Sequence, residues 1–364
     1  MSSTIIVGGG VIGLLSAYEL QRSGEQVTVI DRQQLGQESS WAGGGILSPL
    51  YPWRYPDAVT RLAALSQQLY PDFIEIMQAR TGLQAEYLAG GMLVLGNYDA
   101  ENAADWVLRH GIDARRVNGS EIHEIAPELN TRFDQGWWFA QIHRVRNPRL
   151  ITLIRRYLET TVVELVEHEP ITEIIHEDGR VKALRSATQH FEADRYVIAG
   201  GAWSNDLLLP TGIDIGVKPI KGQMLLLKGE PGLVSRTILS QDHYIIPRQD
   251  GRILVGSTTE DCGFDKSTSE QVQQELLDYA ARTIPAVASL TLERHWAGLR
   301  PGTADGIPRI GAHPQIENLF INCGHYRNGL VMAAASARLL SEIMLDQPLS
   351  LNAQDYQPCD AVHN

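Results

Sequence analysis

Three glycines near the beginning of the chain have the spacing of a dinucleotide-binding turn. Gly8, Gly10 and Gly13 form a G-x-G-x-x-G pattern, and Asp31 follows at the end of the next apolar run. In such a turn Gly8 reverses the chain, Gly10 lets backbone approach a pyrophosphate, and Gly13 lets a helix pack closely on a strand. The Asp31 carboxylate suits ribose hydroxyls. Glycine-rich turns also occur for packing alone, so the spacing by itself leaves both interpretations open.

A second group of residues has the chemistry to hold a carboxylate. Arg300 lies between Leu299 and Pro301 in an apolar, glycine-rich segment. A buried arginine needs a partner, and its planar fork matches a carboxylate. The partner is either a substrate carboxylate or Asp305 in a structural ion pair. Tyr244 alternates with apolar neighbours, as a tyrosine in a strand core does.

Histidines and cysteines give no second chemical centre. None of the 11 histidines stands out as a general base, and we interpret His325 as loop structure. Cys262, Cys323 and Cys359 are widely spaced, which indicates neither a zinc site nor a disulfide framework. This is the pattern of a reducing compartment, so we expect no metal and a cytoplasmic protein.

Strand and helix patterns around the glycine motif supply the elements that would position it. Residues 5–7 form an apolar run long enough for a buried strand, and residues 14–21 have the pattern of an amphipathic helix. Gly24 is suited to end this helix. Residues 26–30 form a second apolar run that places Asp31 at its tip. This order predicts a Rossmann-type unit.

Strand patterns of another kind occupy the middle of the chain. Asp178-Gly179 and Asp250-Gly251 are residue pairs typical of hairpin turns. They predict a small antiparallel sheet and a larger, mostly antiparallel one. The strands of the small sheet are expected at residues 162–166, 171–175 and 181–184, and those of the large sheet lie within residues 90–95, 217–227 and 237–255.

Taken together, the patterns predict two domains of different architecture. Helical periodicity recurs over residues 57–81, 148–159, 267–284 and 330–345. We predict a discontinuous α/β nucleotide-binding domain and an α+β substrate-binding domain with a large, mostly antiparallel sheet. The first comprises residues 1–85, 148–215 and 300–364, and the second residues 86–147 and 216–299.

Composition limits the classes of partner. The 364-residue chain has a formal net charge of −12, which argues against nucleic acid and anionic membranes as main partners. It contains no apolar run long enough to span a bilayer. The glycine motif begins so close to Met1 that we expect no signal peptide.

Several separated segments together resemble the D-amino-acid-oxidase family of FAD-dependent flavoenzymes. The segments are residues 8–13, 38–45, 199–204, 296–302 and 324–329. Within that family the likeness is greatest to the glycine-oxidising branch of thiamine biosynthesis, and it covers nearly the whole chain. The resemblance implies FAD, where the glycine motif alone does not exclude NAD.

The resemblance also assigns residues to the cofactor. It implies that Val11 and Ile12 lie at the pyrophosphate, that residues 44–46 lie along the flavin edge, and that Ile171 offers its backbone to adenine. A glycine-rich loop leading into the helix at residue 330 is either an ordinary cap or a positive helix end facing the flavin. The full set implied is Gly8, Gly10, Val11, Ile12, Gly13, Asp31, Arg32, Ser39, Ser40, Gly44, Gly45, Ile46, Ile171, Gly200, His325, Tyr326, Arg327, Asn328, Gly329, Leu330 and Val331.

For catalysis, the resemblance implies that Arg300 and Tyr244 bind the substrate carboxylate and that Arg327 lies at the pocket floor. Glycine would be oxidised to the imine while O2 becomes H2O2, and the imine would yield glyoxylate and ammonia or enter thiazole synthesis. Hydride transfer from a neutral amine needs no general base. Related sarcosine oxidases attach flavin to a cysteine at the position of residues 299–301, so we expect non-covalent FAD here. Relatives suggest a homotetramer.

Three alternatives stay open at this point. The substrate could be a D-amino acid, sarcosine or D-proline, and the enzyme an oxidase or a dehydrogenase. An RNA-modifying flavoprotein is disfavoured by the net charge of −12 and by the lack of a patch rich in Lys and Arg. A flavin-binding assembly protein without catalysis is disfavoured because Arg300, Tyr244 and Arg327 are all present.

Overall fold

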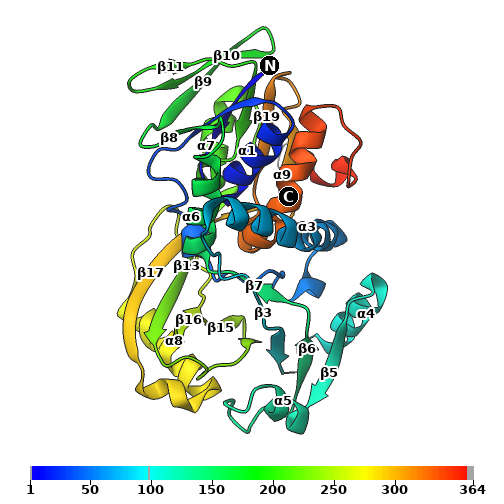
Figure 1. Ribbon diagram of the computed structural model, residues 1–364, viewed down its shortest axis with the longest axis vertical. Coiled ribbons are helices and arrows are strands. Elements are labelled where there is room, and N and C mark those ends of the chain that lie inside the picture. Colours follow the sequence, from blue (N-terminus) through cyan, green and yellow to red (C-terminus); the bar gives the residue numbers. More distant parts are fainter. Residues whose placement is uncertain (1, 97–98, 359–364) are drawn as a thin grey trace.

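Two β-sheets of different kinds organise the chain (Figure 1). The computed structural model describes residues 2–96 and 99–358. A six-stranded sheet has the order β18-β19-β12-β1-β2-β8, and an eight-stranded sheet has the order β17-β13-β16-β15-β14-β4-β6-β5. The six-stranded sheet lies in the upper half of Figure 1 and the eight-stranded sheet in the lower half. The predicted combination of a Rossmann-type α/β fold and a large, mostly antiparallel sheet is confirmed.

The six-stranded sheet collects strands from the beginning, the middle and the end of the chain. All neighbouring pairs are parallel except β18–β19, which is antiparallel. Since β2 and β12 flank β1 on opposite sides, the chain reverses its direction of winding there. Such a switch point opens a crevice at the carboxyl ends of the strands. The strands are β1 (Ser3–Val7), β2 (Gln26–Ile30), β8 (Glu164–Val166), β12 (Arg195–Ile198), β18 (Arg309–Ala312) and β19 (Leu319–Cys323).

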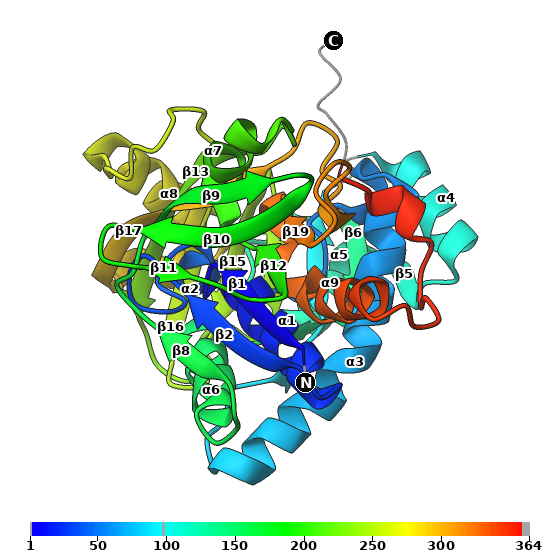
Figure 2. The same cartoon turned by 90° about the horizontal axis from the view of Figure 1, so that it is seen from above.

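Both faces of this sheet are covered, which explains its nearly continuous apolar strands. Ile6 and Val29 pack into a core with the helices on one face, while Ile5 and Ile30 pack on the other face against the small sheet. Figure 2 shows the small sheet from above. The helices of the first face are α1 (Val11–Arg22), α3 (Asp57–Thr81), α6 (Asn147–Leu158) and α9 (Gly329–Met344). The second face carries β9 (Ile171–Glu177), β10 (Arg180–Ser186), β11 (His190–Phe191) and α7 (Ser204–Leu208).

In the eight-stranded sheet every neighbouring pair is antiparallel except β14–β4. Its longest pair, β13–β17, places Ile220 opposite Arg300 and Gly222 opposite Gly298. One face packs against α8 (Glu270–Thr283), and the other carries Tyr244 and Met224 in a separate core. The strands are β4 (Met92–Leu95), β5 (Ala114–Asn118), β6 (Gln135–Phe139), β13 (Lys218–Lys228), β14 (Thr237–Ser240), β15 (His243–Pro247), β16 (Arg252–Gly256) and β17 (Thr291–Gly302).

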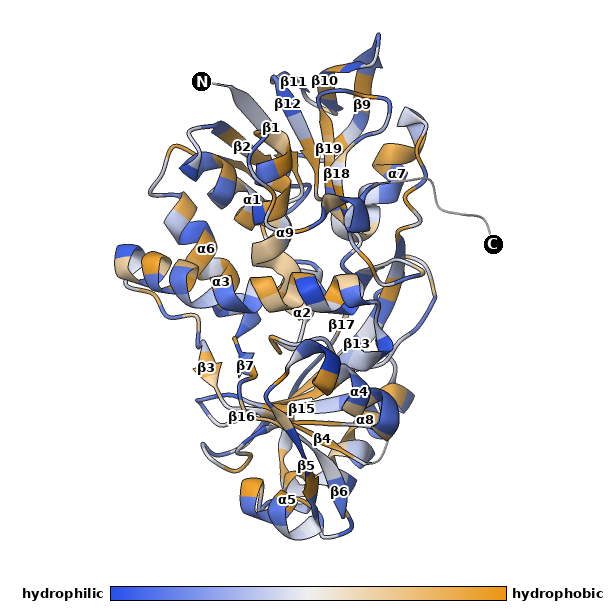
Figure 3. Ribbon diagram, turned by 90° about the vertical axis from the view of Figure 1, so that its right-hand side faces the viewer, coloured by the Kyte–Doolittle hydropathy of each residue, from blue (hydrophilic) through white to orange (hydrophobic). Residues whose placement is uncertain are grey.

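Short elements join the two halves. Helix α2 (Ser39–Ala42) lies between the halves in Figure 3, above the eight-stranded sheet. The strand pair β3 (Leu88–Ala89) and β7 (His143–Arg144) leads from one half to the other. Helices α4 (Ala100–His110) and α5 (Gly119–Ile125) lie beside β5, the edge strand of the eight-stranded sheet.

One predicted strand belongs to a different sheet. Residues 162–166 were expected in the small antiparallel sheet, but this prediction is wrong, because β8 pairs in parallel with β2 at the edge of the six-stranded sheet. Helix α6 directly precedes β8, so β8 ends a crossover connection and is not part of a hairpin. β9, β10 and β11 form the small sheet instead.

Both predicted hairpin turns are confirmed. Asp178 and Gly179 have φ values of 51° and 70°, as a two-residue turn of the primed type requires, and they connect β9 to β10. Asp250 and Gly251 connect β15 to β16, with φ of 85° at Gly251.

The predicted helices are also confirmed, with small shifts at their ends. α8 begins at Glu270 because the Ser269 hydroxyl accepts a hydrogen bond from the Val272 N–H. The division of the chain into two domains remains a prediction; β17 continues to Gly302, past the expected boundary at residue 300. Across residues 2–96 and 99–358, no helix is both long and apolar enough to cross a membrane.

Candidate active site

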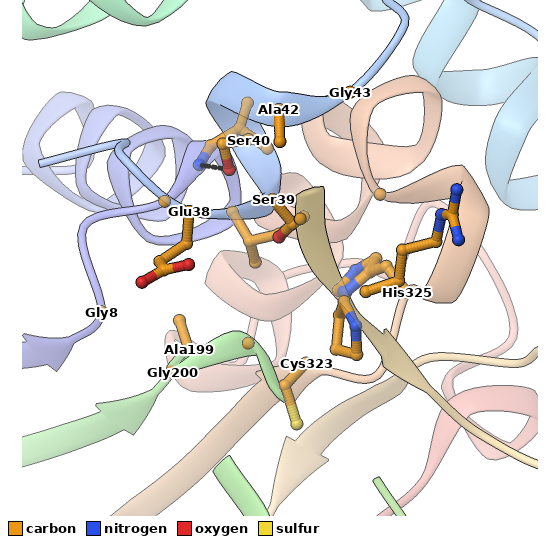
Figure 4. A pocket seen from close by; sticks show the side chains of 18 of the residues that line it. Gly8, Glu38, Ser39, Ser40, Ala42, Gly43, Ala199, Gly200, Cys323 and His325 are labelled. Atoms are coloured by element: carbon orange, nitrogen blue, oxygen red, sulfur yellow. Dashed lines mark hydrogen bonds between the residues drawn. The ribbon is translucent and has the colours of Figure 1, made fainter. Parts of the chain in front are cut away.

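A cavity of about 530 Å³ lies where the two sheets meet. Figure 4 shows Ser39 and Ser40 of α2, Gly200 after β12, and His325 after β19 around it. Most residues assigned from sequence line this one cavity, although they come from segments far apart in the chain. They are Gly8, Gly10, Val11, Ile12, Asp31, Arg32, Ser39, Ser40, Gly44, Gly45, Ile46, Ile171, Gly200, Tyr244, Arg300, His325, Tyr326, Arg327, Gly329 and Leu330.

Three residues assigned to the cofactor do not line the cavity. A Cβ at Gly13 would lie 1.9 Å from the Gly8 carbonyl oxygen, so Gly13 permits close packing of α1 on β1. Asn328 and Val331 are 2% and 1% exposed and face the interior. The helical periodicity of α9 turns these two side chains inward while Gly329 and Leu330 remain on the cavity wall.

The glycine turn forms one end of the cavity. Gly8 has φ of 112°, and a Cβ there would lie 2.3 Å from the Ala199 carbonyl oxygen, so only glycine fits between β1 and β12. Gly10 is the N-cap of α1, and the Val11 N–H donates to the Ser40 hydroxyl over 2.9 Å. The first turn of α1 therefore points its free N–H groups and its positive end at the cavity, as a pyrophosphate site requires.

Asp31 is held at the tip of β2 by backbone donors. Its carboxylate accepts hydrogen bonds from the N–H groups of Gly9 and Gln33 at 2.7 and 2.9 Å. Burial raises the pKa of Asp31, and these two donors act in the opposite direction. The carboxylate is thus fixed in orientation at the cavity wall, where ribose hydroxyls can donate to it.

Trp203 and Glu38 complete this wall, although neither was assigned from the sequence. The Arg32 guanidinium lies 3.5 Å from the centre of the Trp203 ring and donates to Glu38 over 2.8 Å. All three side chains line the cavity. Both missed residues fall within segments that carried the family resemblance, so motif position was the available signal.

Consecutive glycines form a side wall of backbone. A Cβ at Gly45, where φ is 83°, would lie 2.0 Å from the Val145 carbonyl oxygen, and one at Gly44 would lie 2.8 Å from the Ile246 side chain. Arg248 donates to the carbonyl oxygens of Gly44 and Val145, both over 2.8 Å. Its guanidinium is buried, which lowers the pKa of Arg248 to about 10. No role was assigned to Arg248 from the sequence, but the structure shows that it fixes this wall.

Arg300 occupies the other end of the cavity. Its guanidinium donates to the Ser257 hydroxyl (2.7 Å) and to the carbonyl oxygens of Thr258 (3.1 Å) and Lys221 (3.3 Å). A Cβ at Gly222 would lie 2.1 Å from Nη2, so glycine on β13 makes the space. Burial lowers the pKa of Arg300.

No carboxylate among the described residues forms an ion pair with Arg300. Asp305, the alternative partner from sequence, pairs with Arg309 at 3.1 Å instead. The structural ion pair between Arg300 and Asp305 is therefore wrong. A half-buried cation that is solvated only by neutral acceptors retains the capacity to bind an anion.

Tyr244 lies beside Arg300. Its hydroxyl donates to the Met224 sulfur over 3.1 Å, and the ring is buried. Burial lowers the pKa of Arg300, whereas the neighbouring Tyr244 raises it. The tyrosine thus belongs to the strand core and to the cavity wall at once.

Two further residues approach from the loop after β19. Arg327 reaches the cavity and makes one long contact of 3.5 Å to the Asp242 carbonyl oxygen. His325 is 1% exposed, contacts the Ser336 hydroxyl at 2.8 Å, and has its pKa lowered to about 3 by burial. It is neutral at physiological pH, which supports its interpretation as loop structure.

The donor set fits FAD along the whole cavity. Helix α1 offers its N-terminus to phosphates, Asp31 offers an acceptor to ribose, and the backbone wall at Gly44 leaves room for a flat ring. Helix α9 begins at Gly329, on the cavity, and its N-cap Asn328 makes no side-chain capping hydrogen bond. A second positive helix end thus faces the same space, where it would stabilise negative charge.

Comparisons with known proteins agree with this chemistry. The family described as FAD dependent oxidoreductase matches residues 3–343. The chain is 42% identical over 355 residues to glycine oxidase of Pseudomonas putida, covering 97% of each chain. It is 32% identical to the bifunctional protein ThiO/ThiG of Synechocystis, over 98% of this chain and 54% of that protein. The crystal structure of glycine oxidase from Bacillus cereus is similar over 100% of both chains, with a TM-score of 0.89 and 26% identity.

Replacing Gly10 tests the nucleotide end of the cavity. Gly10 has φ of −73°, which valine tolerates, and a Cβ there would meet only the Ser40 hydroxyl at 3.1 Å. The branched side chain of Gly10→Val should fill the phosphate position and abolish retention of FAD, measured by absorbance of the purified protein.

Gly119→Val is the matched control, because a Cβ at Gly119 makes only ordinary contacts of 3.4 Å or more. It should retain FAD. Unchanged FAD affinity in Gly10→Val would show that the glycine turn is not the phosphate site.

Proposed function

The chain belongs to the FAD-dependent oxidoreductase family, and we propose that it oxidises glycine to the imine at the cavity between its two sheets. When bound, FAD supplies the two-electron acceptor, and O2 is reduced to H2O2. The imine hydrolyses to glyoxylate and ammonia or passes to thiazole formation in thiamine biosynthesis. The names of relatives identical at 42% and 32% support this assignment.

The observation that carries the proposal is the half-buried guanidinium of Arg300. It faces the cavity, is solvated by three neutral oxygens, and has no carboxylate partner among the described residues. An amino acid substrate brings the missing negative charge. Its carboxylate would bind Arg300, with the Tyr244 hydroxyl as a second donor, so that the α-carbon is held in a fixed position.

Arg327 adds a second positive charge at the same end. It lowers the pKa of Arg300 in addition to burial, which places the two guanidinium groups within each other's field. A positive field favours the carboxylate of the substrate and disfavours its ammonium form. Glycine therefore binds with its amine more readily neutral, as hydride loss from the α-carbon requires.

No side chain is needed as a general base. His325, the histidine on the cavity wall, is held to Ser336 and has a pKa of about 3, so burial stabilises its neutral form. The described residues contain no cluster of metal-binding side chains. With its pKa lowered to about 3, His325 is a weak base, so the proposed step relies on the positive field around the amine.

The substrate alternatives differ in what they place beside the α-carbon. Ile46, Leu50 and Met224 line the cavity near Tyr244, are buried, and limit the space for a side chain or an N-methyl group. Initial rates with glycine, sarcosine, D-alanine and D-proline, each with O2 and with an artificial acceptor, separate the substrates and distinguish an oxidase from a dehydrogenase. A flavin that glycine does not bleach anaerobically would favour a non-catalytic flavoprotein.

Two further expectations belong to this proposal. The homotetramer suggested by the family can be measured by light scattering during size-exclusion chromatography. The second expectation is a cytoplasmic location. Cys359, part of the cysteine pattern behind it, lies outside the described residues.

Arg300→Ala should raise the KM for glycine while FAD stays bound. A charge-assisted hydrogen bond is worth about 1.5–3 kcal/mol, so each lost bond should weaken glycine binding by about one to two powers of ten. Arg300→Lys should recover only part of this, because an ammonium keeps the charge and loses the planar fork. Steady-state kinetics on both variants provide the measurement.

Asp305→Ala is the matched control, because Asp305 pairs with Arg309 and not with Arg300. Its glycine KM should equal that of the wild type. A near-normal KM for Arg300→Ala, with a loss of melting temperature shared by Asp305→Ala, would refute the carboxylate-binding role.

FAD should be released into the supernatant on acid precipitation. β17 has no cysteine near Arg300, and Cys323, which lines the cavity, has its pKa raised to about 12 by burial. A thiol of this kind is a poor nucleophile at neutral pH. Flavin that stays in the pellet for the wild type, but not for Cys323→Ser, would show a covalent bond to Cys323.

A further inference from the structure

The segment that follows β16 contacts residues at both ends of the cavity. Residues 257–269, which we name the bridging segment, run from the end of β16 to the N-cap of α8. At the beginning of this segment the Ser257 hydroxyl and the Thr258 carbonyl oxygen accept hydrogen bonds from Arg300. The segment therefore starts at the substrate end.

Lys221 on β13 anchors the middle of the bridging segment. Its buried ammonium pairs with Glu260 at 3.1 Å and with Asp265 at 3.0 Å. Backbone hydrogen bonds of 2.8 and 3.0 Å join Lys221 and Glu260 in both directions. These contacts fix where the following residues lie.

The far part of the bridging segment touches the nucleotide end. The Phe264 ring stacks on Trp203, with 5.3 Å between ring centres and 22° between ring planes. The Lys266 ammonium lies 3.2 Å from both carboxylate oxygens of Glu38. Phe264 is 43% exposed, so the ring is not there to fill a core.

Phe264 and Lys266 do not line the cavity, but the residues that they contact do. The Arg32 guanidinium lies 3.5 Å from the centre of the Trp203 ring, and Arg32 also donates a hydrogen bond to the Glu38 carboxylate. Phe264 therefore supports the ring on which Arg32 rests, and Lys266 balances the charge of the carboxylate that orients Arg32.

We propose that Phe264 and Lys266 are positioning residues for FAD, through which the second sheet secures the nucleotide end of the cavity. The proposal rests on FAD binding in this cavity and not on the identity of the oxidised amine. Without the two side chains, Trp203, Glu38 and Arg32 keep their places in the chain but lose their outer support. FAD should then dissociate faster.

The test measures the rate at which the holoenzyme releases FAD after dilution, followed by flavin fluorescence. Phe264→Ala and Lys266→Met should each accelerate release by about two- to fivefold, the size of effect expected for a partly exposed ring contact or ion pair. The double variant should reach about tenfold. The glycine KM at saturating FAD should stay within about twofold of the wild-type value, because both substitutions are at the nucleotide end and do not contact Arg300.

Lys218→Met is the matched control. Lys218 pairs with Asp261 of the same bridging segment but does not reach Glu38 or Trp203. Its FAD release should match that of the wild type. In 1 M KCl the difference between Lys266→Met and the wild type should shrink, since salt screens a half-exposed ion pair; a general loss of structure would not show this.

Wild-type release by the double variant would overturn the proposal, as would equal acceleration by Lys218→Met. Neither result would bear on glycine oxidation, which is measured separately from FAD release. A wild-type protein that releases FAD normally but does not oxidise glycine would refute the proposed function and leave this inference standing.

Discussion

The site depends on the half-buried Arg300 guanidinium, which has no carboxylate partner among the described residues. Removing a cation from water is costly unless its donors are satisfied. Here three neutral oxygens from β13 and from the segment after β16 satisfy part of the fork. Gly222 leaves the space for it, and the register of β13 against β17 sets that glycine beside the arginine. The sheet therefore holds a cation ready for an anion that the chain itself does not supply.

The cavity exists only where distant parts of the chain meet. β1, β12 and β19 come from the beginning, middle and end of the sequence, and their carboxyl ends form the nucleotide end. The opposite wall comes from the other sheet, through Tyr244 and through Arg248, which fixes the carbonyl of Gly44. Neither half alone creates this site, because the two ends of the cavity come from different sheets and Arg248 of one half holds the Gly44 backbone of the other.

Sequence patterns predicted what depends on neighbours along the chain. The glycine turn, the hairpins at Gly179 and Gly251, and the long helices follow from local conformation and periodicity, and the structure has them. The strand at residues 162–166 was assigned to the wrong sheet because alternation does not specify a pairing partner. Glu38, Trp203 and Arg248 were missed because their roles come from contacts with residues far away in sequence, which single-residue chemistry does not reveal.

The same distinction governs the electrostatics. The chain has a formal net charge of −12, which argues against nucleic acid and anionic membranes as main partners. At the cavity, however, the positive field comes from two arginines, Arg300 and Arg327, and from the N-termini of α1 and α9. Helix ends carry partial charge without any charged residue, so composition does not count them. An acidic protein can thus present a positive potential at one cavity, because the local guanidinium groups and helix ends, and not net charge, set the potential there.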